Sequence, residues 1–172
     1  IVIISIFGPI SGAHFNPIVS LVFWLKRMMS FKNFIAYVVM QISGAIFGCV
    51  VANIIFKLPP VTISTLVRHD FSQFLSEILA TFGLILVIFI GSEVSKQTIP
   101  VLVGSYIASA YWFTSSTSFA NPAVTVARQF SDTFTGISPS GVPTFIIAQI
   151  FGAILGFIVI QWLTNTVIES DY

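Results

Sequence analysis

Charged residues are scarce in this chain. Only 8% of its 172 residues are Asp, Glu, Lys or Arg, whereas an average soluble domain carries about 25%. A soluble fold of this length cannot cover its surface with so few charges, which argues against a soluble globular domain and against a disordered chain. The formal net charge of +1 also supplies no positive field for the phosphates of a nucleic acid, so we expect no nucleic-acid partner.

Cysteine and clusters of metal-binding residues are lacking as well. The single Cys49 cannot form a disulfide within the chain, so the sequence does not indicate a redox compartment. His14 has no second His, Cys or Asp at metal-ligand spacing, and His69 belongs to a loop. No Ser stands beside a His with an orienting third group. We therefore expect no metal, no cofactor and no enzymatic activity.

Long apolar runs take the place of charge. Hydrophobic residues make up 56% of the chain, and the mean hydropathy is +0.99. A helix of ~20 apolar residues crosses a ~30 Å hydrocarbon core. Four runs have about this length: Phe34–Phe56, Phe71–Ser92, Ile99–Phe119 and Val142–Thr164. The run Ile1–Ile10 is only half as long. Because apolar residues are continuous and do not alternate, the sequence predicts an all-α, multi-pass integral membrane protein surrounded by lipid.

An internal repeat is the second strong signal. Residues 15–20 match residues 120–125, and residues 41–48 match residues 149–156, with offsets of 105 and 108. Two matched blocks in the same order indicate a duplicated unit. We interpret residues 1–172 as one domain, in which residues 1–70 belong to the first repeat and residues 71–172 to the second. The matched blocks also contain small-xxx-small pairs that favour close helix packing: Gly44 with Gly48, and Gly152 with Gly156.

Each repeat contains an Asn-Pro that should begin a short helix, because Asn suits the helix cap and Pro the first helical position. The helix after Pro17 should end near Lys26 and Arg27, so at roughly 10 residues and ~15 Å it cannot cross. Three full spans separate Asn16 from Asn121, and an odd number brings the second short helix in from the opposite face. The two motifs should therefore meet near the membrane midplane, where helix N-termini repel cations and Asn side chains bind neutral solutes.

These motifs resemble those of the aquaporin, or major intrinsic protein, family, whose pattern is Asn-Pro-Ala twice. The residues that carry the resemblance are Ser11-Gly12-Ala13-His14-Phe15-Asn16-Pro17-Ile18 and Ser118-Phe119-Ala120-Asn121-Pro122-Ala123. The resemblance covers essentially the whole chain. It implies a right-handed helical bundle with inverted repeats, two re-entrant half-helices, a pore in each subunit and a homotetramer. Against this pattern we expect the chain to lack span one and the start of span two.

Two departures from the family pattern bear on the expected pore. Ile18 stands where Ala is usual, and its larger side chain is expected to narrow or reshape the path. The resemblance implies a constriction formed by Ser109, Ser118 and Val124, with a fourth residue upstream of Ile1. Val124 stands where the family usually has Arg. We expect Arg128, one turn further on, to extend to the surface instead of replacing that cation.

A constriction of Ser, Ser and Val predicts a wide path without a fixed cation. This combination is similar to the glycerol-passing members and to aquaporin-like proteins associated with arsenic detoxification. We therefore hypothesise a passive channel for water, glycerol and neutral metalloid acids such as arsenite. The short loops favour a bacterial inner membrane.

Two further side chains, Glu77 and His14, are expected to hold the loops that precede the Asn-Pro motifs. Glu77 is the only acid well inside a span, and the resemblance implies that it accepts hydrogen bonds from the backbone of the second re-entrant loop. His14 is expected to pack in the first loop, with gating as the alternative.

Other functions remain open at this level. A secondary transporter with inverted repeats and a midplane substrate site would need titratable groups there, and Glu77 is the one candidate. Accumulation of solute against a gradient would distinguish it from a channel. A purely structural membrane protein is a further alternative, and an intramembrane enzyme lacks an assembled nucleophile and base.

Overall fold

The chain is mainly helical in the computed structural model, which describes the backbone of residues 1–170 and the side chains of residues 1–165. Within residues 1–170 there are seven helices and no strand, which confirms the predicted all-α class. The helices are α1 (Val2–Ser11), α2 (Pro17–Leu25), α3 (Phe31–Ile55), α4 (Phe71–Val94), α5 (Ile99–Phe113), α6 (Pro122–Arg128) and α7 (Val142–Ser170). Three of them, α3, α4 and α7, are long and apolar enough to cross a membrane.

Helix α5 is shorter than the apolar run in the sequence predicts. It ends at Phe113 after 15 residues, about 22 Å at 1.5 Å per residue, and the segment up to Phe119 is irregular. Thr114 begins the irregular stretch, and its hydroxyl donates to Ala110 O at 2.7 Å. Ser and Thr hydroxyls that bond to nearby groups compete with helix formation, which explains why the run stops early.

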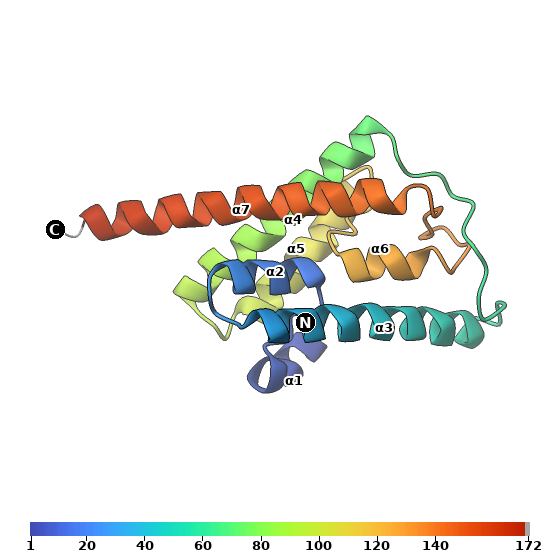
Figure 1. The fold of residues 1–172 in the computed structure, drawn as a ribbon, viewed down its shortest axis with the longest axis horizontal. Helices are drawn as coiled ribbons and strands as arrows, with labels where there is room; N and C mark the ends of the chain where they lie inside the picture. Colours follow the sequence, from blue (N-terminus) through green and yellow to red (C-terminus); the bar gives the residue numbers. More distant parts are fainter. Residues whose placement is uncertain (171–172) are drawn as a thin grey trace.

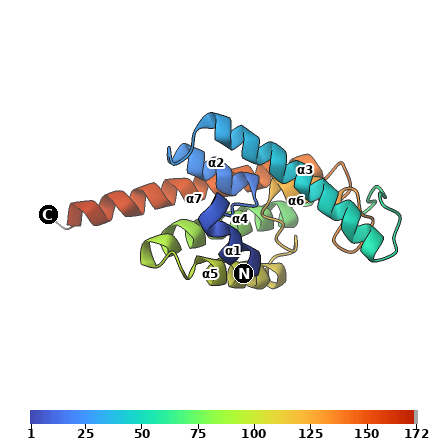
Figure 2. The ribbon, with the colours of Figure 1, turned by 90° about the horizontal axis from the view of Figure 1, so that it is seen from below.

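The two short helices lie between longer ones. In Figure 1, α2 and α6 follow one another along the long axis of the molecule, with α7 on one side and α3 on the other. The turned view in Figure 2 again shows α2 beside α3, with α1 and α5 on the opposite side of the bundle. Both short helices contact α3 and α7, so each is held by long helices from both repeats.

Helices α4 and α7 approach closely because glycines line their contact. A Cβ at Gly156 would lie 2.9 Å from Ile85 Cγ2, and a Cβ at Gly152 would overlap the carbonyl oxygen of Ile78. This pair therefore packs as predicted. A Cβ added at Gly44 or Gly48, the matching pair on α3, would meet no atom of another described element within 4 Å, so the predicted packing is not seen there.

Apolar burial fixes the half-helix α2. Its residues Ile18, Val19 and Val22 form a cluster with residues of α4 and α7. Ile18 is 1% exposed, so its bulk fills the space between these helices. Burial of this large apolar side chain against α4 and α7 is favourable and anchors the first turn of α2.

Candidate functional site

The two Asn-Pro motifs cap the half-helices as their sequence predicts. Asn16 Oδ1 accepts a hydrogen bond from Ile18 N at 2.9 Å, and Asn121 Oδ1 accepts one from Ala123 N at 3.0 Å. The following residue in each motif, Pro17 or Pro122, begins α2 or α6. Each cap satisfies a backbone donor that the first turn of a helix would otherwise leave unpaired.

The same two Asn side chains also bind across the repeats. Asn16 Nδ2 donates to Ala120 O at 2.7 Å, and Asn121 Nδ2 donates to Phe15 O at 3.0 Å. Each amide thus holds the residue that precedes the other Asn. The structure therefore brings the two motifs together.

The backbone before each Asn repeats as well. In both loops, the residues four, three and one positions before the Asn have positive φ angles between 45° and 73°: Gly12, Ala13 and Phe15, and Thr117, Ser118 and Ala120. Left-handed conformations of non-glycine residues persist only where surrounding contacts hold them. The duplication found in the sequence therefore extends to the backbone conformation of the two loops.

A buried carboxylate holds the second loop. Glu77 on α4 is fully buried and accepts hydrogen bonds from Phe119 N and Ala120 N, both at 2.8 Å. Ser116 Oγ and Gln149 Nε2 donate to the same carboxylate at 2.6 and 2.7 Å. Four donors engage its two oxygens, so the contact that the resemblance implied is present and the group is fixed in place.

A glutamine in each repeat binds the half-helix of that repeat. Gln149 Nε2 donates to Thr125 Oγ1 at 2.9 Å, and Gln41 Nε2 donates to Ser20 Oγ at 3.1 Å. These partners are equivalent by the offsets of the sequence repeat. Sequence reasoning missed both glutamines as site residues, although each stands first in its matched block.

His14 lies in the first loop among aromatic rings. Its Nδ1 is 3.0 Å from Ser20 Oγ, and its ring centroid lies 4.2 Å from that of Phe23 and 5.3 Å from that of Tyr37. The side chain is half-buried. These contacts favour packing over gating for this residue.

The residues of the expected constriction occupy different surroundings. Ser118 is 9% exposed and directly precedes Phe119. Val124 packs against the apolar cluster that Phe119 forms with Ile137 and Phe145. Ser109 on α5 is exposed, and its hydroxyl donates to Ser105 O at 2.9 Å. Within the described residues, no hydrogen bond joins Ser109 to Ser118 or Val124.

Arg128 does not extend to the surface as expected. Its guanidinium carbon lies 4.3 Å from the centroid of the Phe119 ring. Its Nη1 atom is buried and has no hydrogen-bond partner among the described residues. Attraction between a cation and an aromatic face explains why the side chain turns inward over the ring.

A second arginine was missed as a site residue. Arg68, which the sequence marked only as part of a connection, is 5% exposed. It donates to Gly136 O at 2.8 Å, Ser116 O at 3.1 Å and Phe134 O at 2.9 Å. It lies in an irregular segment without a motif, so no local signal distinguishes it from a surface arginine.

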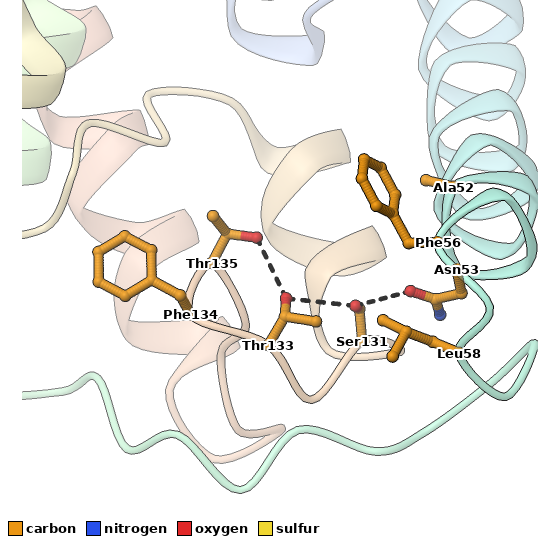
Figure 3. A pocket seen from close by; sticks show the side chains of 8 residues that line it. All are labelled: Ala52, Asn53, Phe56, Leu58, Ser131, Thr133, Phe134 and Thr135. Carbon is orange, nitrogen blue, oxygen red and sulfur yellow. Dashed lines mark hydrogen bonds between the residues drawn. The ribbon is translucent and has the colours of Figure 1, made fainter.

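A hollow of about 530 Å³ lies where the end of α3 meets the loop after α6 (Figure 3). Hydroxyl and amide groups follow one another along it. Ser131 Oγ donates to Asn53 Oδ1 at 2.8 Å. The Thr133 hydroxyl lies 3.3 Å from the Ser131 hydroxyl and 3.4 Å from the Thr135 hydroxyl. The remaining lining residues are Ala52, Phe56, Leu58 and Phe134. These bonds tie the loop after α6 to α3.

Comparison with known proteins gives consistent matches. The family model described as Major intrinsic protein matches residues 1–112. Aquaglyceroporin AqpS of Rhizobium meliloti is 48% identical over 163 residues, which cover 95% of this chain and 70% of the relative. Aquaporin AqpM of Methanothermobacter marburgensis is 26% identical over 92% of this chain and 70% of its own length. The glycerol uptake facilitator protein of Bacillus subtilis is 28% identical over 87% of this chain and 61% of its own length.

Proposed function

The chain belongs to the major intrinsic protein family, and from this membership we propose that its pore runs past the paired Asn-Pro motifs and conducts water, glycerol and neutral metalloid acids. The family and its relatives make it an integral membrane protein and a channel for water or glycerol, not an enzyme. Within the motifs Asn16-Pro17-Ile18 and Asn121-Pro122-Ala123, the proposal assigns contact with the solute to the side chains of Asn16 and Asn121.

The reciprocal exchange between the Asn side chains carries this proposal. An Asn amide has two N–H donors, and each amide here gives one of them to a carbonyl of the other loop. The second donor of each remains available for the oxygen of a water, a polyol or an undissociated acid. Because the caps fix both amides, a solute binds without any reorganisation of the site.

The constriction decides which solutes pass. Ser109, Ser118 and Val124 are small, and the proposal assigns to them a path wide enough for glycerol. The names of two relatives, an aquaglyceroporin and a glycerol uptake facilitator, support glycerol as a solute. Arsenite belongs to the same class of small, uncharged, hydroxyl-bearing molecules.

The buried carboxylate weighs against a secondary transporter. A proton-coupled mechanism needs a titratable group that exchanges its proton during transport. Glu77 is engaged by four donors of the loop and of α7, so it serves as a support. His14 supports the first loop in the same sense.

The two repeats form one channel domain in the proposed assembly. We assign residues 1–70 to the first repeat and residues 71–172 to the second repeat of one channel domain. Homotetramers in a bacterial inner membrane follow from the resemblance, and the most similar relatives named above include two bacterial proteins.

Stopped-flow light scattering on proteoliposomes with the full-length protein tests the function. One run applies an impermeant osmolyte and a second applies glycerol, with protein-free liposomes as the control. Fast shrinkage followed by fast reswelling in glycerol is expected, and arsenite uptake is measured next. Shrinkage without reswelling would restrict the pore to water, and no acceleration in either run would contradict the proposed channel.

A further inference from the structure

The connection between α3 and α4, residues 57–70, lies against the connection between α6 and α7, residues 129–141. Both run along the same end of the molecule in Figure 1. Three backbone hydrogen bonds join them: Thr62 N donates to Phe130 O at 3.1 Å, Ser64 N to Gln129 O at 2.9 Å, and Ser138 N to Leu66 O at 2.7 Å. The α3–α4 connection is therefore a fixed neighbour of the loop that follows α6.

Arg68, near the end of the α3–α4 connection, binds segments on both sides of α6. Its Nη1 donates to Ser116 O at 3.1 Å, before α6, and its Nε and Nη2 donate to Gly136 O and Phe134 O at 2.8 and 2.9 Å, after α6. The backbone of Arg68 is confined as well, because a Cβ added at Gly141 would overlap Arg68 O. A guanidinium presents its donors in a rigid planar fork, so it holds the three carbonyls in a set arrangement.

Ser116 is bound through both its backbone and its side chain. Its carbonyl accepts the hydrogen bond from Arg68, and its hydroxyl donates to Glu77 at 2.6 Å. The same hydroxyl accepts a hydrogen bond from Ser118 N at 3.2 Å. The carboxylate thus engages donors of this loop, while the guanidinium engages an acceptor. Ser118, a residue of the expected constriction, is linked through Ser116 to both charged groups.

The strained part of this loop lies between two residues that Arg68 contacts. Thr117 and Ser118 have positive φ angles of 61° and 50°, which non-glycine residues keep only where surrounding contacts hold them. On one side Ser116 O is bound by Arg68, and on the other side the Phe119 ring centroid lies 5.4 Å from the Arg68 guanidinium carbon. Without these contacts the strained pair is free to relax.

We propose that Arg68 is a positioning residue that sets the width of the constriction without touching the solute, an assignment that rests on the proposed channel function. It holds Ser118 through Ser116, and it holds the Phe119 ring, against whose cluster Val124 packs. Since neither constriction side chain is bulky or charged, the backbone that carries them determines the opening. Loss of the Arg68 contacts lets this backbone relax into the path, which impedes glycerol more than water.

The ratio of glycerol to water permeability, measured on the full-length protein in proteoliposomes, tests the role of Arg68. Partial misfolding lowers both permeabilities by the same factor, so the ratio reports on the constriction alone. R68Q offers one nitrogen, which cannot reach three carbonyls. We expect the ratio to fall about tenfold in R68Q, the change that a barrier difference of about 1.4 kcal/mol produces. An unchanged ratio overturns the proposal.

R68K separates the hydrogen-bonding fork from the charge. Lys keeps the positive charge but has a single nitrogen in place of the fork, so the ratio should fall in R68K as in R68Q. A wild-type ratio in R68K would assign the effect to charge and would overturn the positioning role. R27Q makes the same substitution as R68Q at an exposed arginine and should leave the ratio unchanged. An equal fall in R27Q would also overturn the proposal.

Gly141→Ala disturbs the same contacts while Arg68 stays in the chain, because the added Cβ displaces Arg68 O. It should lower the ratio by a smaller factor than R68Q. If neither variant of Arg68 assembles, Gly141→Ala decides: a lower ratio supports the proposal, and a wild-type ratio overturns it. A wild-type ratio in R68Q leaves the channel in place, whereas a wild-type protein that accelerates neither water nor glycerol contradicts the channel itself.

Discussion

At the scale of single residues, Glu77 shows how a buried charge is used for structure. Its four donors come from the second loop and from α7. Replacing one carboxylate oxygen by an amide nitrogen places a donor against donors. Each lost hydrogen bond of a buried group costs about 1–3 kcal/mol.

We therefore predict that Glu77→Gln lowers the melting temperature of the detergent-solubilised protein and reduces water and glycerol flux together. Fluorescence-detected thermal unfolding and stopped-flow scattering measure the two effects. Glu93→Gln, at an exposed position, is the matched control and should change neither. Intact folding with loss of a proton-dependent transport would contradict the supporting role.

The constriction gives a second prediction at this scale. Val124→Arg places a long side chain next to Phe119, so we expect glycerol flux to fall about tenfold, equivalent to about 1.4 kcal/mol, and water flux to fall much less. Val124→Ala keeps the path wide and should preserve both. Equal losses of water and glycerol in Val124→Arg would show that this residue does not set the width.

At the scale of elements, the half-helices depend on their caps. Isolated helices shorter than about 12–15 residues are marginal in water, and α2 and α6 have 9 and 7 residues. Tertiary burial and the two Asn caps replace the stability that length provides elsewhere.

A double-mutant cycle tests this dependence. Asn16→Ala and Asn121→Ala each remove a cap, worth about 0.5–2 kcal/mol, and a bond to the other loop. Because each amide holds the residue before the other Asn, we expect the losses to be non-additive by about 0.5–3 kcal/mol in denaturant unfolding. Strictly additive losses would mean that the two loops are held independently.

The cap of α4 gives a prediction on pH. Hydrogen bonds from Ser72 Oγ at 2.6 Å and from Gln73 N at 2.8 Å lower the pKa of Asp70 below its usual 3.8. Because the folded-state pKa is depressed, this contribution is present above the unfolded pKa and is lost as pH falls through the folded value. The melting temperature of the wild-type protein should fall as the pH drops below about 4, and that fall should be smaller in Asp70→Asn. An unchanged dependence of melting temperature on pH would contradict this assignment.

Sequence reasoning predicted those elements whose cause is local. Apolar length gave α3, α4 and α7, and Asn-Pro gave the start of α2 and α6. The predicted end of α5 was wrong because the Thr114 hydroxyl bonds locally to Ala110 O and the Ser116 hydroxyl finds a partner, Glu77, that only the folded chain provides. Arg68 and Gln149 escaped prediction because their partners lie far away in the sequence.

At the scale of the whole molecule, two repeats share one site. Neither Asn-Pro motif is complete without a carbonyl from the other repeat. Such a fixed centre suits passive passage, because nothing in it needs to move for a solute to pass.

This leads to a prediction about energetics. Radioactive glycerol in proteoliposomes should equilibrate without accumulating, and imposed proton or sodium gradients should not change its final level. Protein-free vesicles give the background. Uphill accumulation under either gradient would replace the channel with a coupled carrier.

The bond from Asn16 to Ala120 also sets an order of events during biosynthesis. The two residues are 104 positions apart, and ribosomes add about 5–20 residues per second. The first loop therefore waits roughly 5–20 s after it leaves the ribosome before its partner carbonyl exists. During that interval the nascent first half holds an uncompleted loop, so its final shape is acquired late, when the second loop arrives.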